Sequence, residues 1–480
     1  MIAALTEKKI YLLAGLFLIL ACIGLATEFF YVLALPFVLL MLYFLFTQID
    51  KVMWVVLFFT PLSITLVHED FNVGLSLPTE PFLALVTAIV LFQAFFGSGL
   101  NKDILNHPIS KAILLYLIWM LMTTLTSELP IISVKYFIAR LWFIIPYYLV
   151  MVFILNTEVK RELFYWVFLI PLVGVAIYTL VVHSQYSFSK DTSVWVMFPF
   201  FKEHTSWGAV LAMYYPISVY FVFRKGDWGL KSVAVFVLIV MTIALILSYT
   251  RAAWLSLAVA AIVWLILKLR IKWQFIGLAG LVLVIGLMAS WNTISQRFEK
   301  TESVSSDDLG EHVSSISNVS TDASNLERIN RWKSAIRLFK DHPVFGSGPG
   351  TYMFLYAPYQ KPWEKTIIST NSGNRGNAHS EYIGPLAESG IFGLLTVLIL
   401  FSTILFYGVN VYQNSPSGNP QELVLMAILG LTTYFAHGVL NNFLDMDKAS
   451  APFWGFTALI VAQDFANRKI FSGSKKALKA

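Results

Sequence analysis

Apolar stretches of roughly 16 to 20 residues recur along the whole chain, and they constrain its fold more than any other feature. A helix needs about 20 apolar residues to cross the hydrocarbon core of a bilayer. Only helices and closed barrels satisfy all their backbone hydrogen bonds there. The stretches are continuously apolar rather than alternating, which excludes a barrel. The sequence therefore predicts an all-α integral membrane protein.

We predict fourteen membrane spans, or twelve to thirteen if closely spaced stretches merge. Their approximate ranges are 10–26, 29–46, 52–67, 81–97, 112–126, 136–155, 163–182, 207–223, 232–249, 252–268, 275–291, 384–408, 422–440 and 450–466. The composition agrees, because 57% of the 480 residues are hydrophobic and only 13% are charged. A mean hydropathy of +0.70 excludes an ordinary soluble domain.

The distribution of lysine and arginine predicts the orientation, because the cytoplasmic connections of membrane proteins are enriched in both. With a cytoplasmic N-terminus, the inner segments hold 18 of these residues. The short outer connections hold five, namely Lys135, Lys190, Lys202, Arg251 and Lys448. The net charge of +6 therefore marks topology and not nucleic-acid binding. The single cysteine, Cys22, excludes a disulfide framework.

Residues 292–383 interrupt the apolar pattern with 20 of the 62 charged residues and three of the eight histidines. The orientation places this stretch outside the cytoplasm. We predict a transmembrane bundle of about 11 spans at 1–291 and a periplasmic loop domain with the catalytic residues at 292–383. About three further spans and a short basic cytoplasmic tail follow at 384–480. The outer segments 67–80 and 183–206 are also long enough to contribute to a site.

One helix is predicted inside the loop domain. Ser324 and Glu327 form a capping box, and the helix continues to about Lys340. Its apolar stripe comprises Ile329, Trp332, Ile336 and Phe339. At 100° per residue Arg328 falls closer to this stripe than Arg331 does, so we expect Arg328 to face a site and Arg331 to face solvent. The alternative is that both are ordinary solvated arginines.

The segment after this helix carries two further signals. Residues 341–343 end the helix, and the glycines of 346–350 predict a tight turn with exposed backbone. This turn lacks the Lys-Ser/Thr pair of a nucleotide-binding loop. His379 lies just before the chain re-enters the membrane, where it could act as a general base of near-neutral pKa or be an ordinary surface histidine. Glu388 follows at the membrane entry.

Two arginines are predicted at or within the spans. Arg251 begins a span with Trp254 close behind it, and no loop separates it from the preceding span. It suits either interfacial snorkelling or a fixed contact to a lipid phosphate. Arg140 lies five residues into a span and has the same two interpretations. The pair Asp445 and Asp447 resembles the paired aspartates of metal-dependent glycosyltransferases, but in a short outer turn we interpret it as an ordinary connector.

Four motifs, taken in order and with the long loop between spans, resemble the O-antigen ligase and polymerase superfamily of bacterial membrane proteins. They are Arg251-Ala252-Ala253-Trp254, the stretch from Arg328 to Trp332, the turn at 341–350, and His379 followed by 388–393. The resemblance covers about 240 to 400 and is vague before it. One departure is Ser380, which stands where an asparagine is common in the family.

The resemblance implies a glycosyltransferase of the bacterial inner membrane with its active site on the periplasmic face. It would move a glycan from undecaprenyl pyrophosphate to an acceptor sugar with inversion, without metal or cofactor. By motif, Arg251 and Arg328 would hold the pyrophosphate with Arg331 nearby, and His379 would be the catalytic base. Possible supporting residues are Arg140, Trp254 and Glu388.

Several functions remain open at this point. Ligases and polymerases differ only in the acceptor, and we expect a ligase with a lipid A core acceptor. Transfer to protein side chains is a related option. A lipid-linked oligosaccharide flippase belongs to a different class, but it would show a charged central cavity and short outer loops. A structural scaffold would leave the outward arginines unexplained.

Overall fold

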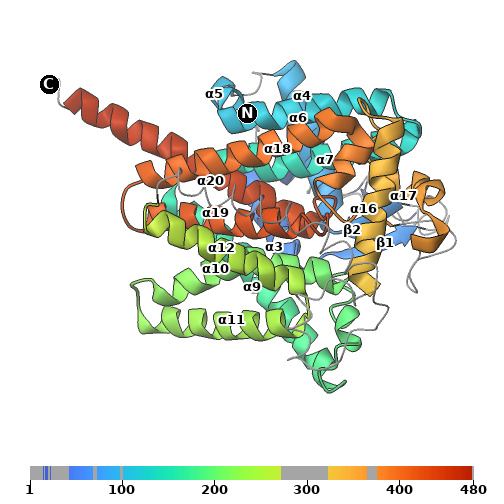
Figure 1. Ribbon diagram of the computed structural model, residues 1–480. Helices are drawn as coiled ribbons and strands as arrows, with labels where there is room; N and C mark the ends of the chain where they lie inside the picture. The colour runs from blue at the N-terminus through green and yellow to red at the C-terminus, as the bar shows by residue number, and fades with distance from the viewer. Residues whose placement is uncertain are drawn as a thin grey trace. The chain divides into compact units, whose positions relative to one another are not determined.

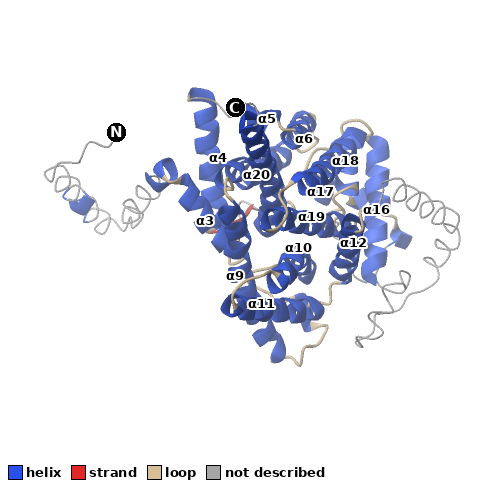
Figure 2. Cartoon of the chain, turned by 90° about the vertical axis from the view of Figure 1, so that its left-hand side faces the viewer, coloured by secondary structure: helices blue, strands red, loops and turns tan. Residues whose placement is uncertain are grey.

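The computed structural model describes residues 43–68, 73–97, 101–271, 323–364 and 376–477, with a few single positions between 15 and 22. The chain divides into two compact units, Met1–Val55 and Val56–Ala480. Helix α3 (Ile49–Phe59) runs across the boundary, and the following paragraphs concern the second unit. Figure 2 shows that the regular structure of the described residues is helical apart from one short hairpin.

Eight helices in the described ranges are long and apolar enough to cross a membrane. They are α4 (Thr79–Phe96), α6 (Pro108–Leu125), α7 (Pro130–Ile144) continued by η2 (Ile145–Val150) and α8 (Met151–Ile154), α9 (Glu158–Ser184), α10 (His204–Phe223), α11 (Trp228–Leu247), α12 (Arg251–Lys268) and α18 (Ile383–Asn414). Each coincides with a predicted span. The prediction of an all-α integral membrane protein is confirmed.

Two more helices, α19 (Asn419–His437) and α20 (Asp447–Ala477), coincide with the predicted spans 422–440 and 450–466. The shorter helical elements are α5 (Lys102–Asn106), η3 (Thr192–Val194), α16 (Ala323–Asp341), α17 (Tyr352–Leu355), η4 (Ala357–Tyr359) and η5 (Pro362–Glu364). The predicted spans 10–26 and 275–291, and most of 29–46, lie outside the described residues.

The predicted span at 52–67 is wrong in its second half. Helix α3 ends at Phe59, and an antiparallel hairpin follows, formed by β1 (Ile64–His68) and β2 (Val73–Leu77). The register pairs Ile64 with Leu77 and His68 with Val73. A short run of β-branched and apolar residues is compatible with either a helix or a strand, so hydropathy alone could not separate them.

Helix α19 lies at the centre of the unit, where it packs against α10, α12, α18 and α20. Its residues are buried almost continuously from Leu423 to Phe435. A helix that is surrounded on all sides needs apolar residues around its whole circumference. Gly430 lets α10 approach closely, because a Cβ there would lie 2.6 Å from the carbonyl oxygen of Met213.

The helix ends form two separate groups of contacts. At one end, Arg224 pairs with Glu162, and Lys268 Nζ lies 2.8 Å from Glu422 Oε1. The sequence assigns both cations to inner segments. At the other end, the turn before α12 contacts the start of α10, where Thr250 Oγ1 donates to the His204 carbonyl at 2.9 Å. Helix α16 crosses this second end and packs against α18 (Figure 1).

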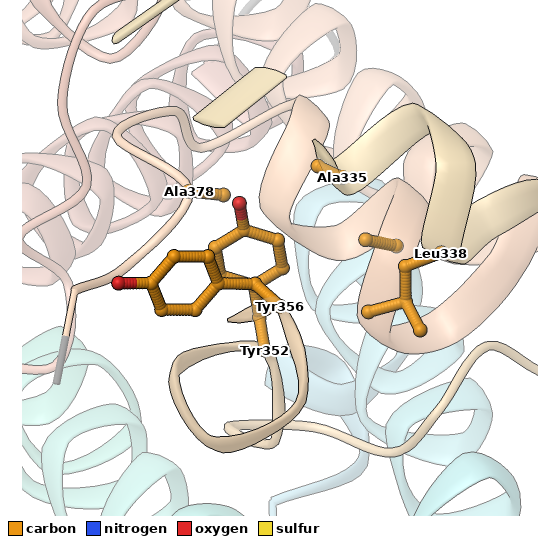
Figure 3. Close-up of a cluster of buried hydrophobic side chains, with 6 residues drawn as sticks. Ala335, Leu338, Tyr352, Tyr356 and Ala378 are labelled. Carbon is orange, nitrogen blue, oxygen red and sulfur yellow. The ribbon is translucent and has the colours of Figure 1, made fainter. Parts of the chain in front are cut away.

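The buried face of α16 is not the predicted apolar stripe. Its buried residues include Ser334, Ala335 and Leu338, whereas Ile336 of the stripe is 40% exposed. Figure 3 shows Ala335 and Leu338 in one cluster with Tyr352, Tyr356 and Ala378. Small residues on this face let the two stacked tyrosine rings lie against the helix, which an Ile or Trp would prevent.

Candidate functional site

His379 is held by a short, well-bonded segment at the start of α18. Its own φ is +49°, a left-handed conformation that few non-glycine residues adopt. The Asn377 side chain accepts a hydrogen bond from the His379 backbone N–H at 3.1 Å. Ser380 Oγ then accepts from the N–H groups of Tyr382 and Ile383, which caps the helix. These bonds stabilise the unusual backbone conformation of the segment.

Arg331 reaches this segment from α16. Its Nε donates to Glu327 Oε1 at 2.9 Å, and its guanidinium lies 5.1 Å above the centre of the Tyr356 ring. Its Nη1 also donates to the Asn377 carbonyl at 3.3 Å. Arg331 is only 8% exposed, so the prediction that it faces solvent is wrong. The ion pair with Glu327 and the aromatic contact compensate for the loss of hydration.

Arg328 lies one helical turn before Arg331 on α16 and is the second cation near His379. Burial, Arg328 and Arg331 together lower the pKa of His379 to about 3. The expectation of a near-neutral pKa is therefore wrong for this environment. Loss of hydration is the largest cause, because burial disfavours the charged imidazolium, and the two guanidinium groups also oppose a third positive charge. Both arginines are thus within electrostatic reach of the imidazole.

Arg251 joins this group from the start of α12. Its guanidinium and that of Arg328 are within electrostatic reach of each other. The turn that carries it is fixed by the contact of Thr250 with α10 and by Trp254, whose Nε1 donates to the Leu245 carbonyl at 3.1 Å. The structure thus brings Arg251, Arg328 and His379 together from three distant parts of the chain. Trp254 supports the turn through this bond.

Arg140 lies in the interior of the helix bundle rather than at a lipid headgroup. It is 4% exposed, and its Nη1 donates to the Leu444 carbonyl at 2.6 Å. Its Nη2 donates to the Tyr136 hydroxyl at 2.5 Å. Both interpretations offered by the sequence, snorkelling and a lipid-phosphate contact, require an accessible side chain. Arg140 instead supports the segment that precedes α20.

Glu381 is a residue that the sequence did not single out. Its Oε1 accepts from the Tyr434 hydroxyl at 2.5 Å and from the N–H groups of Phe443 and Leu444 at 2.9 and 3.1 Å. Its own N–H donates to the Gly438 carbonyl at 2.8 Å. Burial raises the pKa of Glu381 although nearby Arg140 opposes that shift. The residue ties the His379 segment to the α19–α20 turn.

Glu388 has a comparable structural position on α18. Its Oε1 accepts from the Tyr352 N–H at 3.1 Å, and its carbonyl accepts from the Gly348 N–H at 2.8 Å. The 346–350 turn is therefore buried for most of its length, and the prediction of exposed backbone is wrong. Gly346 has a φ of +69°, and a Cβ there would lie 2.2 Å from the Glu388 carbonyl carbon. The glycines permit close packing and do not form an open loop.

Two carboxylates, Glu203 and Asp445, lie beside these cations. Both residues reach solvent, and burial of the carboxyl group nevertheless raises the pKa of each. Glu203 is within electrostatic reach of both Asp445 and Arg328. The interpretation of the 445–447 turn as an ordinary connector is therefore incomplete. Asp447, by contrast, is buried and accepts hydrogen bonds from other side chains.

The described residues include no group of three or more His, Cys, Asp or Glu side chains that could hold a metal ion. The groups gathered near His379 are arginines and carboxylates. The arginines suit an anion with several oxygen atoms, because guanidinium groups bind phosphate and carboxylate oxygens in pairs.

The comparisons with known proteins identify part of this chain. Residues 236–398 match the family model described as O-antigen ligase. The matched stretch begins in α11, ends in α18 and contains Arg251, Arg328, Arg331 and His379. No curated protein matches the chain. The family match confirms the resemblance that the sequence motifs indicate.

Proposed function

We propose that the chain transfers a glycan from undecaprenyl pyrophosphate to an acceptor sugar, because residues 236–398 match the O-antigen ligase family model. Membership supports an enzyme of membrane glycan assembly. The donor, the acceptor and the residue roles are our proposal. The acceptor is a lipid A core sugar, and the transfer takes place at the periplasmic face of the inner membrane.

The observation that carries this proposal is the convergence of Arg251, Arg328 and His379. The two arginines come from α12 and from α16, and they interact despite their equal charge. Two neighbouring guanidinium groups suit a ligand with several anionic oxygens, and pyrophosphate carries the charge and the oxygen atoms to bind both. Arg251 begins a membrane span, which is the depth at which a lipid-linked pyrophosphate would lie.

The reaction balances without a nucleotide. An acceptor hydroxyl oxygen attacks the anomeric carbon of the donor sugar and forms the new glycosidic bond. The bond between that carbon and the pyrophosphate oxygen breaks, and its electron pair leaves with undecaprenyl pyrophosphate. The hydroxyl proton moves to His379. Attack from the face opposite the leaving group inverts the anomeric configuration.

The arginines have two roles in this mechanism. They stabilise negative charge on the leaving pyrophosphate, which removes the need for a general acid or a metal ion. They also act on the base, because burial together with the charges of Arg328 and Arg331 lowers the pKa of His379 to about 3. Pyrophosphate bound to Arg328 would cancel part of that charge and raise the proton affinity of the imidazole. His379 therefore becomes an effective base once the donor is bound.

Ligase and polymerase activities share this mechanism and differ in the acceptor alone. A polymerase would use the glycan of a second lipid-linked chain in place of lipid A core. Parallel assays with the two acceptors separate these activities.

The residue roles are tested with purified protein in liposomes, a lipid-linked glycan donor and lipid A core acceptor. We expect His379→Gln to retain donor binding and to reduce the turnover rate by about 10²- to 10⁴-fold, the usual contribution of a general base. We expect Arg251→Gln and Arg328→Gln to weaken donor binding. Lys333→Gln, an exposed change on α16, is the control and should behave as wild type. Normal turnover in the His379 variant would refute its role.

A further inference from the structure

The turn between α19 and α20, residues 438–446, has no role in the proposal above. It is held in place from both sides. Glu381 accepts from the backbone of Phe443 and Leu444, while Arg140 donates to the Leu444 carbonyl. On the other side, Asp447 accepts from Ser63 Oγ at 2.6 Å. The turn is thus a rigid wall that adjoins the His379 segment.

Polar atoms with unused hydrogen-bonding capacity lie along this wall. Asn442 Oδ1 is buried without a hydrogen-bond partner among the described residues. The same is true of Nδ1 of His437, which is 1% exposed, and of Nε1 of the fully buried Trp454. Buried polar atoms are usually paired, so each exception needs an explanation. Donors and acceptors together suit a ligand that carries hydroxyl groups, because a hydroxyl can both donate and accept.

Asn442 and Trp454 both line a cavity of about 50 Å³ beneath the segment 377–381, together with Arg140 and Glu381. A cavity needs roughly 10 to 15 Å³ to hold one water, so this one holds a few waters or a small polar substituent. It is too small for a whole glycan. It can receive one substituent of a sugar, while the remainder of the sugar lies outside the cavity beside the exposed Asp445.

Asp445 is the accessible charged group of the wall. Its side chain is exposed to solvent, and its carboxylate accepts a hydrogen bond from its own backbone N–H. It lies within electrostatic reach of Glu203, Glu381 and Arg140. A carboxylate in this position repels pyrophosphate. The arginines near His379 therefore suit an anion, whereas the wall suits neutral hydroxyl groups.

We propose that Asp445 and Asn442, on the turn that is hydrogen-bonded to the His379 segment, bind hydroxyl groups of the acceptor sugar. The inference rests on the proposed transferase function and deepens it. A carboxylate can accept from two neighbouring sugar hydroxyls, and such charge-assisted bonds are stronger than neutral ones. The Asn442 amide then selects the orientation of the sugar from the cavity side.

The test is a measurement of KM for each substrate in the liposome transfer assay. Asp445→Asn should raise KM for lipid A core acceptor by about tenfold or more and leave KM for the lipid-linked donor unchanged. Asn442→Ala should shift the same constant in the same direction. Asp445→Glu should recover part of the loss. Asp103→Asn, an exposed change in α5 at the other end of α6, is the matched control.

The outcomes distinguish a wrong acceptor assignment from a wrong transferase function. An unchanged acceptor KM in both wall variants, or an equal change in donor KM, overturns the acceptor assignment. Loss of donor binding in the Arg251 and Arg328 variants would then leave the transferase proposal standing. If wild-type protein transfers no glycan, the transferase proposal itself fails. The thermal midpoint of each detergent-solubilised variant reports whether it is folded, independently of substrate binding.

Discussion

Arg331 shows how one side chain can influence a site without contacting the substrate. It is paired with Glu327, and it donates to the backbone two residues before His379. Its positive charge nevertheless acts on the imidazole and lowers its pKa. We therefore assign Arg331 a positioning and electrostatic role and leave direct pyrophosphate contact to Arg251 and Arg328.

This role predicts a change in pH dependence. The double variant Glu327→Gln/Arg331→Gln removes the ion pair without leaving a buried carboxylate. Burial and Arg328 still lower the pKa of His379, but with one cation fewer nearby the pKa should rise above about 3. The imidazole is then protonated, and inactive as a base, over a wider acid range. The acid limb of kcat/KM for the donor should move to higher pH than in wild type.

The measurement is a pH profile of transfer between about pH 4.5 and 8, the range in which histidine normally titrates. Lys333→Gln removes a charge from an exposed position of the same helix and should leave the profile unchanged. Superimposable profiles for wild type and the double variant would contradict the electrostatic role of Arg331.

At the scale of elements, α18 contains a kink that the site depends on. Gly390 has a φ of +70° and a ψ of −168°, a conformation essentially restricted to glycine. A Cβ at this position would lie 2.0 Å from the Val344 carbonyl oxygen. The kink admits the backbone of residues 343–344, and Ile391 N–H donates to the Pro343 carbonyl at 3.0 Å. It thereby lets the 346–350 turn pack against α18, where the N–H groups of Ser347 and Gly348 donate to the carbonyls of Ala387 and Glu388.

Gly390→Ala should therefore be strongly destabilising. Backbone strain contributes about 1 to 3 kcal/mol, and the steric overlap adds to it. We expect a lower thermal midpoint of the detergent-solubilised protein and a matching loss of transfer. Gly174→Ala is the control, because Gly174 is in α9 and a Cβ there meets no atom within 4 Å. Equal midpoints for the two variants would disprove the requirement for glycine at 390.

Local signals in the sequence predicted some elements well. The helix predicted from Ser324 to about Lys340 matches α16 in extent, but Ser324 lies within α16 and is not its N-cap, and Glu327 pairs with Arg331. The buried face of α16 was not predictable in this way. It is set by Tyr352 and Tyr356, which contact the helix only in the folded chain. The periodicity of one helix does not show which of its faces another element will cover.

At the scale of the whole molecule, hydropathy predicted most of the helices because burial in lipid imposes their length and composition. Site residues were predictable from the sequence only where they lay next to the end of a predicted membrane span. Arg251 begins a span and His379 precedes one, whereas Glu381 and Asp445 look like ordinary connector residues in the sequence. Their importance comes from the packing of the 377–381 segment against the α19–α20 turn. Glu381 bonds to Phe443 and Leu444, which are more than 60 residues later in the chain, so a local sequence pattern does not reveal the contact.

The two groups of helix-end contacts also bear on function at this scale. Arg251, Arg328, His379 and Asp445 belong to one end, and the Arg224 and Lys268 ion pairs belong to the other. This separation agrees with the alternation of spans expected from the lysine and arginine distribution. A site at one end suits transfer between two substrates at one membrane face. A flippase must carry its cargo from one face to the other.

The most direct test of the account follows both products in one assay. Purified wild-type protein in liposomes receives lipid-linked glycan and lipid A core acceptor, with EDTA present and no nucleotide. The account predicts acceptor-dependent release of undecaprenyl pyrophosphate, one molecule for each glycan joined to the acceptor, and loss of both products in His379→Gln. Movement of the lipid-linked glycan between leaflets without any joined product would contradict the transferase assignment.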